Sequence, residues 1–186
     1  MIHTFDTAAL PATPWKNGGG TTREIVCQPP GAGMDSFDWR VSIASIAKAG
    51  PFSAFPGIDR VILLLDGAGV HLQGGDINHR LDTPGQPFAF SGDVALGCTL
   101  LGGASTDFNV MARRGRVRAD VRILAAAEDI AASSGLLMVL RGSWQVGDAR
   151  CAPGQGLWWD AAVQLSVTPQ TAAALLIAVS LSQTGC

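Results

Sequence analysis

The sequence predicts an all-β protein, and two observations support that class. Short stretches rich in apolar and β-branched residues recur along the 186 residues, several with the period-two alternation of a half-buried strand. The chain has 23 Gly, 10 Pro and only 15% charged residues, a composition typical of short elements joined by tight turns. The predicted strands are residues 22–27, 38–46, 61–65, 97–101, 108–112, 117–124, 136–140, 163–168 and 174–181. Only the Ala-rich stretch 124–134 predicts a helix, and a short one.

A weak internal repeat predicts how these strands are arranged. Residues 64–72 resemble 139–146, since in both an apolar strand meets a Gly turn and reverses into an alternating strand. Residues 84–90 match 153–159 in the same way, with a Pro-Gly-Gln turn before an aromatic strand. We therefore expect two cupin-like, jelly-roll barrels. Residues 1–116 form the first and hold the ligand pocket, and residues 117–186 form the second, packed tightly on the first, with 117–134 bridging them. A chance match of Gly-rich turns is the alternative.

Bulk properties exclude several classes of function. The net charge is −2 and no basic stripe is present, which argues against a nucleic-acid partner. Residues 1–6 carry no signal-peptide pattern, and the longest apolar run, 172–181, is too short to span a membrane and fits a buried strand. The four Cys form no C-x-x-C pair and no disulfide framework, so we expect a cytoplasmic protein.

The histidines argue against a metal cofactor. Many cupins bind a metal through an H-x-H pair, a nearby Glu and a later His. His71 and His79 lack that spacing and have no companion Glu, and residues 117–186 contain no His. We expect no metal and no other cofactor, with both histidines on the surface of a hairpin.

Polar residues on predicted strands suggest a pocket in the first barrel. Arg40 and Ser42 alternate with apolar residues on strand 38–46, and a Pro- and Phe-rich loop leads to Arg60 at the start of another strand. Two such arginines could clamp a carboxylate through forked hydrogen bonds, although a solvated strand end is the usual role of such an Arg. Residues 107–111 alternate so that Asp107, Asn109 and Met111 face one way. Asn109 could contact a ligand there, and Asp107 could orient an arginine.

The Gly-rich segment 15–24 leaves two interpretations open. It is not a phosphate-binding loop, because its Lys precedes the glycines and no helix follows. It could be a flexible connecting loop, or a lid whose backbone N–H groups face a ligand.

Four of these segments resemble the HutD/Ves family. The resemblance lies in W-K-N-G-G-G-T-T-R-E-I (15–25), F-D-W-R-V-S-I-A (37–44), G-P-F-S-A-F-P-G-I-D-R (50–60) and D-F-N-V-M-A-R-R-G (107–115), over roughly the first two-thirds of the chain. It implies a metal-free, two-cupin bacterial protein associated with histidine utilisation. The family's motif positions fall on Trp15, Lys16, Asn17, Arg40, Ser42, Phe52, Arg60, Asp107 and Asn109.

Three functions follow as hypotheses. The first is a protein that senses or limits histidine utilisation by binding a small carboxylate such as urocanate, formiminoglutamate or formylglutamate, through Trp15, Lys16, Asn17, Arg40, Ser42, Phe52, Arg60 and Asn109. The second is a metal-free isomerase or hydrolase acting on such an acid, with Glu24 or Asp107 as the catalytic base. The third is a structural or interaction protein, for which a polar interior would be an unneeded cost in stability. The expected partner is the small acid, with no nucleic acid or membrane, and a homo-oligomer is left open.

Overall fold

The computed structural model describes residues 1–184, and its elements are strands apart from one 3-10 turn, Thr7–Ala9. All nine predicted strands are present. The predicted helix at 124–134 is wrong: this stretch contains the end of one strand and the whole of another, β13, which pairs with β18. Pairing with β18 and burial of Ile130 outweigh the helix propensity of the alanines.

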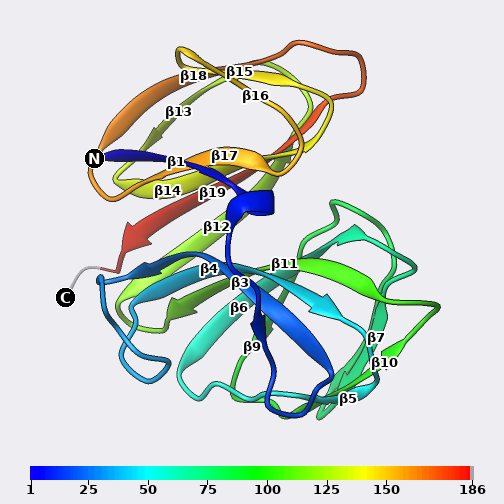
Figure 1. The fold of residues 1–186 in the computed structure, drawn as a ribbon. Helices are drawn as coiled ribbons and strands as arrows, with labels where there is room; N and C mark the ends of the chain where they lie inside the picture. Colours follow the sequence, from blue (N-terminus) through cyan, green and yellow to red (C-terminus); the bar gives the residue numbers. More distant parts are fainter. Residues whose placement is uncertain (185–186) are drawn as a thin grey trace. The chain divides into compact units, whose positions relative to one another are not determined.

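The chain divides into two compact units (Figure 1). The central unit comprises residues 11–116, and the terminal unit comprises residues 1–10 together with the chain from Val117 onward. The first ten residues thus belong with the C-terminal part of the chain, and residues 117–134 lie within the terminal unit.

Two sheets build the central unit. The six-stranded sheet has the order β2-β3-β4-β11-β6-β9 and the four-stranded sheet the order β5-β10-β7-β8. The strands of the larger sheet are β2 (Thr13–Pro14), β3 (Gly20–Gln28), β4 (Trp39–Ile46), β6 (Ile58–Asp66), β9 (Phe88–Ser91) and β11 (Ser105–Arg113). Those of the smaller sheet are β5 (Gly50–Phe52), β7 (Val70–Gly74), β8 (Ile77–Leu81) and β10 (Leu96–Leu100).

Two sheets also build the terminal unit, in the orders β1-β17-β14-β19-β12 and β13-β18-β15-β16. The strands of the five-stranded sheet are β1 (Ile2–Asp6), β12 (Val117–Leu124), β14 (Ser134–Arg141), β17 (Gln155–Trp159) and β19 (Leu175–Gln183). Those of the four-stranded sheet are β13 (Glu128–Ala132), β15 (Trp144–Val146), β16 (Ala149–Cys151) and β18 (Val163–Pro169).

The internal repeat is present in the topology. Strands β4 to β11 of the central unit and β12 to β19 of the terminal unit follow one another in the same order and pair in the same way. The register shifts at the same place in both, at Thr106/Asp107 opposite β6 and at Val139/Arg141 opposite β19. The turn after β6 and the turn after β14 each begin with a Gly at positive φ, Gly67 at 94° and Gly142 at 73°. The two segments matched in the sequence, 64–72 and 139–146, therefore occupy equivalent positions.

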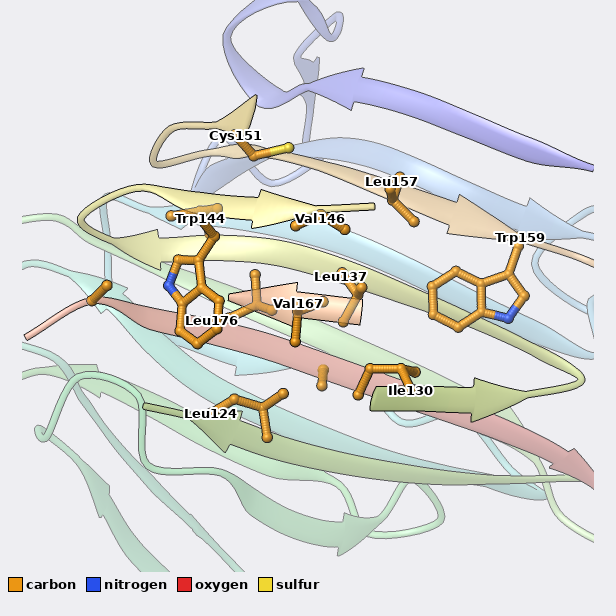
Figure 2. Packing of buried hydrophobic residues seen from close by; sticks show 13 residues of the cluster. Leu124, Ile130, Leu137, Trp144, Val146, Cys151, Leu157, Trp159, Val167 and Leu176 are labelled. Carbon is orange, nitrogen blue, oxygen red and sulfur yellow. The ribbon is translucent and has the colours of Figure 1, made fainter. Parts of the chain in front are cut away.

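The terminal unit has an apolar interior. Its core contains two fully buried indoles, Trp144 and Trp159, packed among aliphatic side chains from both sheets (Figure 2). The labelled members are Leu124, Ile130, Leu137, Trp144, Val146, Cys151, Leu157, Trp159, Val167 and Leu176.

Candidate functional site

Three neighbouring strands of the central unit carry the polar side chains predicted from the sequence. Because β4, β11 and β6 lie side by side, Met111 pairs with Arg40 on one side and with Arg60 on the other. Two residues along the strands Asn109 pairs with Ser42, and two residues further Asp107 pairs with Ala44. Directly paired residues point to the same face of a sheet, so these side chains share one surface.

That surface borders a cavity of about 490 Å³, a volume ordinary for a small-molecule site. Side chains from β2, β3, β4, β5, β6 and β11 and from the loops after β2, β3 and β5 line it. The lining residues are Pro14, Trp15, Lys16, Asn17, Thr22, Met34, Arg40, Ser42, Ala44, Pro51, Phe52, Ser53, Phe55, Arg60, Asp107, Asn109 and Met111.

Arg60 is held rigidly in this cavity. Its side chain is only 4% exposed, and the guanidinium lies 4.6 Å from the ring centre of Phe52, 5.3 Å from that of Phe55 and 5.0 Å from that of Phe90. Nη1 donates to the backbone oxygen of Ser53 and Nη2 donates to Oδ1 of Asn109, both at 3.2 Å. Nε is buried without a hydrogen-bond partner in the described structure. Burial lowers the pKa of Arg60 to about 10, so the group stays cationic at neutral pH.

Arg40 is the second buried cation of the cavity. Its Nε donates to Oε2 of Glu24 at 2.6 Å, and its Nη1 contacts Oγ of Ser42 at 3.3 Å and Sδ of Met111 at 3.9 Å. Glu24 pairs with Ser42 and therefore shares the cavity face, but β2 pairs only with Thr21 and Thr22, so β3 is the outer strand of the sheet at this point. The Glu24 side chain is consequently 49% exposed and does not line the cavity.

Asp107 lines the cavity as a buried carboxyl group. It is 2% exposed, and neither carboxyl oxygen has a hydrogen-bond partner in the described structure. Burial raises the pKa of Asp107 to about 7, against the opposing effect of the Arg60 charge. A buried, unpartnered carboxyl group costs stability, so its presence in a cavity is typical of functional sites.

The Gly-rich segment forms a tight turn between β2 and β3 rather than a lid with free backbone donors. The backbone N–H of Gly18 donates to the oxygen of Trp15 at 3.0 Å, and that of Gly19 donates to Oδ1 of Asn17 at 2.9 Å. The Trp15 indole is fixed by a 2.8 Å hydrogen bond from Nε1 to Oγ1 of Thr22. The turn thus places the side chains of Trp15, Lys16 and Asn17 at the cavity, and its N–H groups at Gly18 and Gly19 are already used within the turn.

The equivalent interior of the terminal unit is filled. Gly135 of β14 pairs with Trp159, in the position where Arg60 of β6 pairs with Phe90. A Cβ on Gly135 would lie 2.6 Å from the Trp159 ring, so the indole lies against the backbone at the place where Arg60 bears its side chain. Leu176 stands in the position of Asp107. Of the two repeated units, the central one therefore has a polar cavity face and the terminal one has a packed apolar core.

The structure brings together the eight residues predicted to bind a ligand, Trp15, Lys16, Asn17, Arg40, Ser42, Phe52, Arg60 and Asn109, and adds Asp107. Their binding role remains a prediction. Sequence reasoning did not name Met34, Phe55 or Met111 as binding residues. Alternation did predict that Met111 shares the face of Asp107 and Asn109, and Phe55 lies in the loop already noted for its aromatic residues. Nothing in the local pattern marks Met34, which reaches the cavity from the loop after β3.

The histidines lie elsewhere. Nε2 of His71 is 2.6 Å from Oδ1 of Asn78 on the β7–β8 hairpin, and His79 stacks on Phe88 with ring centres 3.7 Å apart. Within residues 1–184, no group of three His, Cys, Asp or Glu side chains is arranged to hold a metal ion. In the same part of the chain, no helix has the length and apolarity needed to cross a membrane.

The fold and the cavity together define a class, an all-β protein of cupin-like fold with a polar, cationic pocket in one of two repeated units. The chain belongs to the HutD family, whose model matches residues 7–177. It is 43% identical over 158 residues to Protein Ves of Cronobacter sakazakii, covering 84% of this chain and 86% of the relative. The structure of HutD from Pseudomonas fluorescens SBW25 superposes with a TM-score of 0.87 at 32% identity over the whole of both chains. A conserved protein of unknown function from Pseudomonas aeruginosa PAO1 also has a TM-score of 0.87, at 32% identity, covering 98% of this chain and 99% of that one.

Proposed function

We propose that the central unit binds a small carboxylate of histidine degradation, such as urocanate, formiminoglutamate or formylglutamate, and that the protein thereby senses or limits histidine utilisation. The observation that carries the proposal is the pair of buried arginines, Arg40 and Arg60, which come from two strands on either side of β11 and line one cavity. A solvated strand end would not place a guanidinium at 4% exposure among three phenyl rings.

The charges favour an anionic ligand. Lys16, Arg40 and Arg60 line the cavity, against a single carboxyl group, Asp107. Glu24 offsets part of the Arg40 charge from outside the cavity. Arg60 is already oriented by Asn109 and Ser53, so a bound carboxylate would meet a guanidinium that loses little further freedom.

The proposed function also concerns the fold of each unit and the compartment in which the protein acts. Each unit is a cupin-like barrel, the ligand binds inside the central one, and the protein acts without metal in the cytoplasm. The filled interior of the terminal unit supports the assignment of binding to the central unit alone.

Calorimetric titration with the three acids tests the proposal. A charge-assisted hydrogen bond contributes about 1.5–3 kcal/mol, so Arg60→Ala should weaken binding by about ten- to hundredfold. Arg60→Lys should lose nearly as much, because an ammonium cannot reproduce the planar fork. Arg80→Ala is the matched control, since Arg80 lies on β8, is exposed and pairs with Asp82. Thermal melts of each variant establish that the fold persists. Binding unaffected by both Arg60 variants, or no binding of any acid by the wild type, would refute the proposal.

A metal-free enzyme is the second candidate, and Asp107 is the observation that favours it. Its pKa of about 7 suits a general base at neutral pH. Glu24 is a weaker candidate, because it is half exposed and bonded to Arg40. Product analysis of the titration mixtures separates the two functions, since turnover abolished by Asp107→Asn would establish the enzyme.

A further inference from the structure

Asp107 is the cavity residue that anion binding leaves unexplained. A carboxylate ligand needs donors, and the arginines and Lys16 supply them. The negative charge of Asp107 in the same cavity repels such a ligand, and it also lowers the stability of the protein when no ligand is bound. The side chain nevertheless lines the cavity at 2% exposure, with both oxygens unpartnered in the described structure.

Other side-chain acceptors in or beside the cavity already accept hydrogen bonds within the protein. Oδ1 of Asn109 accepts from Arg60, and the carboxylate of Glu24 accepts from Arg40. Oδ1 of Asn17 accepts from the backbone of Gly19. Arg and Lys side chains have no acceptor at all. The Asp107 carboxyl group is therefore the charged acceptor that this cavity offers to a ligand.

We propose that Asp107 is a specificity-determining residue that accepts a hydrogen bond from an N–H group of the ligand, so that the cavity selects small acids that also carry an N–H donor. This inference rests on the proposed carboxylate-binding function and specifies its ligand class. The donor ends of Arg40 and Arg60 take the carboxylate, and Asp107 takes the donor at the opposite end.

The strand register sets the spacing that such a ligand must have. Nη2 of Arg60 donates to Asn109, and Asp107 lies two residues from Asn109 on the same face of β11. Two residues along a strand correspond to about 7 Å. The ligand therefore has its carboxylate and its N–H several bonds apart. A simple diacid of the same length would place its second carboxylate against Asp107 and be disfavoured by charge repulsion.

The experiment compares matched ligands on wild-type protein and variants at pH 8, where Asp107 is ionised. Urocanate and pyrrolylacrylate carry a ring N–H, and furylacrylate has the same length and an oxygen in place of that N–H. The wild type should bind the two N–H acids at least about tenfold more tightly than furylacrylate, because a site with an unpaired acceptor discriminates against a ligand without the donor.

Asp107→Leu should abolish this preference without unfolding the protein, since Leu176 occupies the equivalent position of the terminal unit. Asp107→Asn should retain part of it, because the amide oxygen still accepts a hydrogen bond. Asp66→Asn, an exposed aspartate at the end of β6, should leave it unchanged.

The outcomes distinguish the two proposals. If none of the three acids binds, the carboxylate-binding function fails. If all bind the wild type with similar affinity, or if the preference persists in Asp107→Leu, the function stands and the role of Asp107 is overturned.

Discussion

Replacing Asp107 by Asn should stabilise the protein, and the gain should grow with pH. The pKa of Asp107 is about 7 in the folded protein against an ordinary value of 3.8. Between these values the folded state binds a proton that the unfolded chain has lost. The stability of the wild type therefore falls as pH rises from about 4 to about 7 and levels off above. Asn cannot ionise, so the variant lacks this loss.

The magnitude follows from the two pKa values. Their difference corresponds to about 4 kcal/mol over the whole range, of which about 3 kcal/mol falls between pH 5 and pH 8. Urea denaturation of wild type and Asp107→Asn at these two pH values measures it. Every other titrating group is common to both proteins, so its contribution cancels in the difference. Asp66→Asn, which removes an exposed carboxylate from β6, should show no comparable dependence. A difference in unfolding free energy between wild type and Asp107→Asn that stays constant from pH 5 to pH 8 would refute the reasoning.

Two further predictions concern packing in the two units. Gly20→Ala should lower the melting temperature and weaken ligand binding, because a Cβ there would overlap the backbone oxygen of Ser45 and lie 3.2 Å from the Trp15 ring. Gly103→Ala is the control for the melts and the titrations, since nothing lies within 4 Å of a Cβ at that position. Trp159→Ala should reduce the unfolding free energy by about 3–5 kcal/mol through the cavity it leaves in the terminal unit, and Trp158→Ala, at a half-buried position, should cost less in the same urea experiment. Equal losses for the two tryptophans would contradict the filled core.

The strands and one face of the site could be predicted because both depend on period-two alternation. Arg40 and Ser42 on β4, and Asp107 and Asn109 on β11, keep that phase in the structure. Glu24 on β3 shares that face, since it pairs with Ser42. Alternation could not show that Glu24 is exposed. That exposure arises because β2 pairs only with Thr21 and Thr22 and leaves β3 as the outer strand at Glu24.

Features that depend on contacts between distant parts of the chain could not be predicted from the local sequence pattern. The alanines of residues 124–134 favour a helix locally, and only the partner strand β18 makes this stretch extended. The aromatic cage of Arg60 combines Phe52 and Phe55 with Phe90, which comes from a strand about 30 residues later. Likewise, the contrast between the two interiors depends on pairings such as Gly135 with Trp159, which no local window contains.

Strand β1 has a consequence for the order in which the protein can fold during synthesis. Its partner is β17, and the hydrogen bond between Gln155 and Asp6 joins residues 149 positions apart. Residues 11–116 contain every strand of their own two sheets, so the central unit can fold as soon as these residues have left the ribosome. Residues 2–6 leave earlier still but have no sheet to join until β17 is made. During synthesis the edge of β1 therefore stays unpaired longest, which is the interval when an extended strand is most open to wrong pairing or to a chaperone.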